Sequence, residues 1–116
     1  MNAKVLILDD SQERHDIFDM KLEGELLTHV FTHEEAVKAL EAQTPKTLFD
    51  CVYLDHDLGT DPVTGFNTAR FIAESLPKEL HPRIVVVHSC NSVRAPLMVE
   101  TIERAGILSR WEMFRI

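Results

Sequence analysis

The sequence has no apolar run near the roughly 20 residues that a helix needs to cross a bilayer. Its start, MNAKVLILDD, is short and turns acidic too soon for a signal peptide. We therefore expect a cytoplasmic protein without a membrane anchor. No repeat, low-complexity tract or linker-like stretch divides the chain, so residues 1–116 are predicted to form a single domain.

Cysteine is scarce as well. Cys51 and Cys90 are the two in the chain, and each stands beside an apolar run typical of a strand. This spacing does not suggest a disulfide framework, so we expect two small buried side chains in a reducing compartment. A bridge between Cys51 and Cys90 on neighbouring strands is the alternative.

Positive charge is also in short supply. The chain has 12 Lys and Arg against 19 Asp and Glu, which gives a net charge of −7. A broad nucleic-acid surface needs basic side chains opposite the phosphates, so this balance argues against one. One small RNA end in a pocket neutralised by a metal ion is still compatible with the composition.

What the chain does have is a regular alternation of strand and helix patterns. Short apolar runs predict strands at 4–8, 27–31, 51–54 and 84–87, with a fifth at 111–116. Helical patterns follow the first four strands, near 11–23, 32–43, 66–76 and 93–105. Ser11 and the Thr32–Glu35 capping box mark two helix starts. This order predicts an α/β fold: a parallel sheet covered on both faces by helices, which makes three layers.

Polar side chains follow three of the predicted strands. In a parallel α/β sheet, ligands bind outside the carboxyl ends of the strands. The residues at those ends are Asp9 and Asp10, then Asp55, His56 and Asp57, then His88, Ser89 and Asn91. Turn chemistry alone does not account for three strand ends of this kind, so a functional site is predicted at this edge.

The carboxylates suggest a divalent metal, Mg²⁺ or Mn²⁺, because hard cations take carboxylate oxygens. Asp9, Asp10 and Asp55 are the candidate ligands. Asp9 and Asp10 can instead complement the dipole of the following helix. Asp55 and Asp57 alternate in an extended segment and so point the same way. Asp55 can be a ligand or a nucleophile; Asp57 can be a ligand, an acid/base group or a cap of the loop.

The two histidines at the edge, His56 and His88, are candidates for proton transfer near neutral pH. Alternation turns His56 away from the face that Asp55 and Asp57 share, and a packed or metal-bound imidazole is the other interpretation of both. The remaining histidines lack such a context and are read as surface or satisfied positions: His15, His29, His33 and His81.

Three polar residues are candidates for holding phosphate. Ser89 and Asn91 can donate hydrogen bonds to phosphate oxygens, or they can cap the following helix. Arg14, one turn into the first helix, can reach back and hold a phosphate as a fork. It can equally be solvated or pair with an acid such as Asp10.

This arrangement resembles the receiver domain of two-component response regulators. The acidic pair Asp9–Asp10, the strand end DCVYLD and the hydroxyl of Ser89 carry the likeness. The resemblance implies a doubly wound sheet of order 2-1-3-4-5, Mg²⁺ held by Asp9, Asp10 and Asp55, and Asp55 as phosphoacceptor. The chain departs from receivers in three ways: residues 106–116 contain no Lys, no last helix fits, and the loop 55–65 is long.

A closer match is the family of cyclic-phosphate-processing receiver domains. The chain is similar to it at LDDxxxR (residues 8–14), LDHDLG (54–59) and HSxN (88–91). This resemblance implies action on cyclic phosphate ends during RNA repair.

Two functions follow from these readings. The first is a metal-assisted phosphoesterase acting on a cyclic phosphate, with an RNA end or a phosphate-containing small molecule as its partner. The second is a stand-alone receiver phosphorylated on Asp55, which acts as a signalling or binding module. The oligomeric state is left open.

Overall fold

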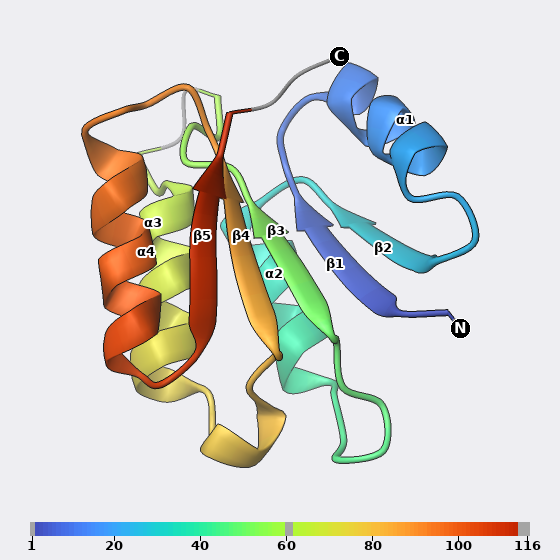
Figure 1. Ribbon diagram of the computed structural model, residues 1–116, viewed down its shortest axis with the longest axis vertical. Coiled ribbons are helices and arrows are strands. Elements are labelled where there is room, and N and C mark those ends of the chain that lie inside the picture. The colour runs from blue at the N-terminus through green and yellow to red at the C-terminus, as the bar shows by residue number, and fades with distance from the viewer. Residues whose placement is uncertain (1, 60–61, 114–116) are drawn as a thin grey trace.

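The computed structural model describes residues 2–59 and 62–113, which form a five-stranded parallel sheet with helices packed against it (Figure 1). The strand order is β2-β1-β3-β4-β5. The strands are β1 (Lys4–Leu8), β2 (Leu26–Val30), β3 (Cys51–Leu54), β4 (Ile84–His88) and β5 (Leu108–Glu112). The helices are α1 (Gln12–Lys21), α2 (His33–Glu41), α3 (Gly65–Arg70) and α4 (Arg94–Arg104), with a π-helix at Phe71–Ser75 and a 3₁₀-helix at Lys78–Leu80. None of the described helices is long and apolar enough to span a membrane.

Local sequence determines where the first two helices begin. The Ser11 hydroxyl accepts a hydrogen bond from the backbone N–H of Arg14, three residues into the turn. The Thr32 hydroxyl accepts from the N–H of Glu35 in the same way. Both caps satisfy backbone donors that have no partner inside the helix. They confirm the two helix starts predicted from the sequence.

The two faces of the sheet are covered unequally. The larger apolar cluster joins alternate residues of β1, β3 and β4 to α2, α3 and α4. The opposite cluster is small and contains Val5, Ile7 and Phe18 of α1. Alternation along the strands explains how the central strands serve both clusters. The described structure thus has the three predicted layers, and no helix follows β5 among its residues.

The fifth strand lies earlier than the sequence suggested. It runs from Leu108 to Glu112 in register with β4, where Ile84 pairs with Leu108 and His88 with Glu112. Of the predicted strand 111–116, residues 114–116 lie outside the described part. The prediction was displaced because β5 is an edge strand in which just one residue, Ser109, is buried, so an apolar run does not mark it.

Two smaller predictions also need correction. The helix predicted at 66–76 is α-helical only to Arg70, and a π-turn then carries it to Ser75, closed by the bond from Leu76 N–H to the Phe71 carbonyl. Both cysteines are free, which excludes the bridge. Cys51 is half-buried as part of β3, but Cys90 is exposed because it follows the end of β4.

The junction between β3 and α3 requires a glycine. The N–H of Gly65 donates to the His56 carbonyl at 2.9 Å, which brings the start of α3 against the end of β3. A Cβ on Gly65 would lie 1.7 Å from the carbonyl oxygen of Asp55. Position 65 therefore needs glycine because two backbone segments approach closely there, and not because of an unusual φ.

We predict that Gly65→Ala costs about 3 kcal/mol or more of unfolding free energy, because the end of β3 or the start of α3 must move. Gly24→Ala is the matched control. Gly24 has φ +93° and open space around it, so that change should cost only about 1 kcal/mol. Urea unfolding of both variants measures the difference, and equal losses would contradict the close approach.

Candidate functional site

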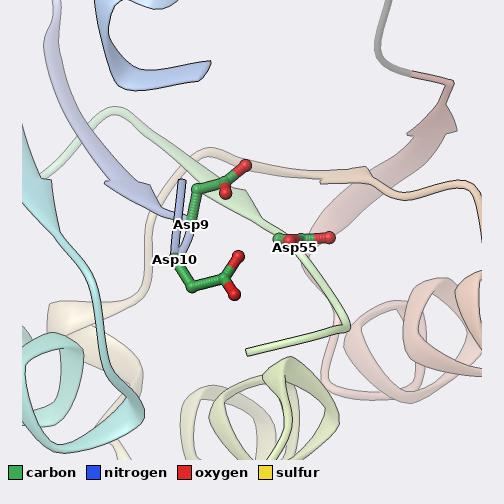
Figure 2. A group of neighbouring side chains, drawn as sticks. All are labelled: Asp9, Asp10 and Asp55. Carbon is green, nitrogen blue, oxygen red and sulfur yellow. The ribbon is translucent and has the colours of Figure 1, made fainter. Parts of the chain in front are cut away.

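Three carboxylates meet at the carboxyl edge of the sheet. Asp9 and Asp10 follow β1, and Asp55 follows the neighbouring strand β3 (Figure 2). One oxygen from each lies within 4.8 Å of the others. Asp9 and Asp55 are buried, whereas Asp10 is exposed. The predicted convergence of the two strand ends is confirmed.

Arg14 offsets part of the negative charge of this acidic group. Its Nε donates to Oδ2 of Asp9 at 2.7 Å, and its Nη2 lies 3.2 Å from Oδ1 of Asp10 and 3.4 Å from Oδ2 of Asp55. The hydrogen bond to Asp9 raises the pKa of Arg14. Of the two sequence readings of Arg14, pairing with an acid is the one observed, and it extends to three acids. Arg14 reaches these acids because it lies in the first turn of α1, four residues after Asp10.

The two buried carboxyls respond in opposite directions. Burial acts to raise the pKa of Asp9, but hydrogen bonds from His88, Arg14 and the backbone N–H of Ser11 outweigh it and lower that pKa to about 2. Burial, and then the charge of Asp9, raise the pKa of Asp55 to about 7, against the effect of Arg14. Asp9 is thus a fixed anion, and Asp55 is the carboxyl whose charge depends on pH.

The end of β4 adds a histidine to the site. His88 is 3% exposed, and its Nε2 lies 2.9 Å from Oδ2 of Asp9. Since the carboxylate accepts, Nε2 carries the proton in this bond. The Phe18 ring stands edge-on to the imidazole, with centroids 5.1 Å apart. Burial lowers the pKa of His88, although the bond to Asp9 acts the other way.

A cleft of about 380 Å³ opens over these groups. Its lining includes the acids Asp10, Asp55 and Asp57 together with Arg14, His88 and Ser89, but not the fully buried Asp9. The Ser89 hydroxyl accepts from the N–H of Asn91 at 3.0 Å and keeps its own proton to donate. Gly59 and Cys90 also line the cleft. Gly59 is the last residue of the LDHDLG motif and Cys90 is the variable position of HSxN, but neither one was singled out from the sequence.

Three predicted site residues do not line this cleft: Asp9, His56 and Asn91. His56 points elsewhere, as alternation suggested, and its Nδ1 lies 2.9 Å from Oδ1 of Asp57. The side chain of Asn91 accepts from the backbone N–H groups of Val93 and Arg94, at 3.2 and 2.9 Å. Asn91 therefore caps the turn into α4, which was the alternative reading of this residue.

The histidines read as satisfied positions have partners. The buried His15 donates from Nε2 to the Asp9 carbonyl at 2.8 Å, and its Nδ1 contacts Nδ1 of His29. His33 bonds the Thr68 hydroxyl, and His81 bonds the Leu76 carbonyl. The prediction that these histidines are surface or satisfied positions is confirmed. His15 also holds the backbone of Asp9 through its hydrogen bond to the carbonyl.

Comparison with known families decides the affiliation. Residues 4–104 match the family described as the cyclic-phosphate processing receiver domain. The chain belongs to this family. The predicted resemblance is therefore confirmed, and with it the receiver-like sheet order. No curated protein matches the chain.

Solved structures of receiver domains share the fold of this cyclic-phosphate processing receiver domain. TrrA from Thermotoga maritima, a response regulator in complex with Mg²⁺ and BeF, is 18% identical with a TM-score of 0.73, over 98% of this chain and 88% of that one. The receiver domain of sensor kinase PA1611 from Pseudomonas aeruginosa, with magnesium in its active-site cleft, is 18% identical with a TM-score of 0.71, over 100% and 88%. NtrX from Brucella abortus is 22% identical with a TM-score of 0.71, over all of this chain but 24% of that one.

The raised pKa of Asp55 predicts a pH-dependent stability. The ordinary pKa is 3.8 and the folded one about 7, so the folded state holds the proton more tightly than the unfolded chain. The tighter proton binding by Asp55 adds to the free energy of unfolding. This contribution is fully present below about pH 4 and is lost as pH rises through 7. In chelator, Asp55→Asn should therefore gain up to about 4 kcal/mol over the wild type between pH 4 and 8.

Urea unfolding at a series of pH values measures this gain. Asp16→Asn, the same change at an exposed position of α1, is the control and should follow the wild type throughout. A difference between Asp55→Asn and wild type that is flat with pH would mean that Asp55 ionises as an ordinary carboxyl.

Proposed function

We propose that the domain is a metal-assisted phosphoesterase that opens a cyclic phosphate, of the 2′,3′ kind found at RNA ends and in nucleotides. One observation carries the proposal: of three converging carboxylates, Asp10 and Asp55 line a cleft that also holds a further acid, Asp57, a serine hydroxyl and the imidazole of His88. A phosphate-transfer site needs a charge anchor, a proton carrier and donors to phosphate oxygens, and these residues supply all three.

The donor set suits Mg²⁺, with Mn²⁺ as the alternative. Asp9, Asp10 and Asp55 offer only carboxylate oxygens, the ligands that hard divalent cations prefer. Two of the receiver structures compared above hold magnesium, which supports the same assignment here. A bound cation would neutralise the phosphate and favour charge build-up on its oxygens.

The role of Arg14 would change when a divalent cation binds. Arg14 pairs with all three acids, and the cation would take over these charge interactions. The guanidinium would then be released to hold a phosphate oxygen, for which its fork geometry is suited. The Ser89 hydroxyl would donate to another phosphate oxygen. Arg14 is thus both a counter-ion of the three acids and a candidate phosphate ligand.

Ring opening needs one proton transfer. Water forms a new P–O bond, one of the two bonds from phosphorus to ribose oxygen breaks, and the water proton ends on the departing oxygen. We assign the carrier role to Asp57, which lines the cleft and whose side chain is 70% exposed. His88 donates to Asp9 and orients that ligand, as outer partners of metal ligands do. Direct proton transfer by His88 or His56 stays a prediction.

A stand-alone receiver phosphorylated on Asp55 is the second candidate function. The strand order and the carboxylate trio favour it equally. The charge balance favours it less, because residues 79–116 contain no Lys to pair with an acyl phosphate. Treatment with acetyl phosphate and Mg²⁺, followed by intact mass, tests this reading through an adduct that Asp55→Asn abolishes.

The direct test is hydrolysis of 2′,3′-cyclic nucleotides and of a short RNA ending in a cyclic phosphate, with Mg²⁺ or Mn²⁺. We expect a phosphomonoester product and a loss of about 100-fold or more in kcat/KM for Asp55→Asn and Asp57→Asn. Asp16→Asn should retain full activity. Intact substrates with the wild type, or equal rates in Asp55→Asn, would reject the phosphoesterase.

A further inference from the structure

A second cleft adjoins the acidic one and has the opposite charge. It has a volume of about 410 Å³ and lies between the loop after β3, α3 and the start of α4. Its charged or ionisable lining consists of His56, Arg70 and Arg94, and none of its described lining residues is an Asp or Glu. In a chain of net charge −7, a cleft with two arginines and a histidine is a local reversal of sign.

The cationic groups in this cleft are available to a ligand. Arg94 forms no ion pair within the described residues. Arg70 has only an exposed pair with Glu74 at 3.5 Å, which contributes little in water. Asn67 uses its side-chain oxygen to bind the N–H of Thr64, which leaves its amide protons to donate.

The two clefts share a wall. Asp57 lines the acidic cleft and His56 lines the basic one, and the two side chains are joined by the 2.9 Å bond from Nδ1 to Oδ1. With Nδ1 donating to this carboxylate, Nε2 makes no hydrogen bond to a described residue, and in the imidazolium form of the ring it can donate to a phosphate oxygen. On the far side, Arg94 is tied by its backbone to Asn91, two residues after Ser89.

We propose that the cleft of His56, Asn67, Arg70 and Arg94 is a second phosphate subsite, which holds the phosphodiester next to the cyclic phosphate of an RNA end. The inference rests on the proposed function and makes its substrate specific: an oligonucleotide rather than a cyclic mononucleotide. Arginine forks bind phosphate oxygens in pairs, and one strand can lay successive phosphates in adjoining clefts. His56 is then a substrate-binding group.

Kinetics with two substrates tests the specificity. A dinucleotide ending in a 2′,3′-cyclic phosphate should be hydrolysed with a lower KM than the cyclic mononucleotide. In Arg94→Ala and Arg70→Ala, KM for the dinucleotide should rise about tenfold more than KM for the mononucleotide, since a charged hydrogen bond is lost. Arg83→Ala removes an exposed Arg that directly precedes β4, at the amino ends of the strands and so away from both clefts. This change should alter neither KM. Equal effects on both substrates would overturn the subsite.

Anion binding without turnover separates this inference from the activity. Inorganic phosphate titrated in chelator should shift the side-chain amide of Asn67 and the Nε–H of Arg94 in NMR spectra, and saturate. Arg70→Ala should weaken that binding, whereas Arg83→Ala should not. No saturable shift, or binding undiminished in Arg70→Ala, overturns the subsite. If these shifts appear while both cyclic phosphates stay intact, the anion cleft stands and the phosphoesterase fails.

Discussion

The mutual repulsion of three carboxylates held within 4.8 Å of one another is the constraint on which the rest of the site depends. Two of them are buried, where unbalanced negative charge is most costly. The fold answers with Arg14 from α1 and His88 from β4, which both bind Oδ2 of Asp9. That support falls mainly on Asp9, whereas burial, and then the charge of Asp9, raise the pKa of Asp55 to about 7. In the proposed function, a divalent cation would take over the place of the monovalent guanidinium among these acids.

The sheet order is what brings these groups together. β1 lies between β2 and β3, and β4 lies beside β3, so three consecutive strand ends share one edge. The chain places β2 on one side of β1 and then crosses to place β3 on the other side. In parallel α/β sheets, ligands bind at the strand ends next to such a switch point. Gly65 then lets α3 start directly against the Asp55 carbonyl, just before His56 and Asp57, which line the basic and the acidic cleft.

Most of the fold and the acidic edge could be predicted from the sequence, because both follow from periodic patterns. Apolar runs located β1, β3 and β4, and the polar residues after them had to meet once the sheet was parallel. The displaced β5 was not predictable, since its place is fixed by pairing with β4 and not by its own residues. The pairing of Arg14 with three acids was not predictable either. The sequence indicates that this arginine can reach an acid, but its distances to all three depend on how the ends of β1 and β3 meet in the fold. The cleft around His56 and Arg94 joins residues from two distant segments, which no local pattern reveals.

The exchange of Arg14 for a divalent cation is the central claim, and an NMR titration with Mg²⁺ that follows the Arg14 Nε–H tests it most directly. That proton is held by Asp9 at a donor–acceptor distance of 2.7 Å, so it should be protected and shifted before titration. The account predicts saturable Mg²⁺ binding during which the Arg14 signal moves toward that of a solvated arginine, with the same dissociation constant. Absence of Mg²⁺ binding, or binding that leaves the Arg14 signal unchanged, would contradict it.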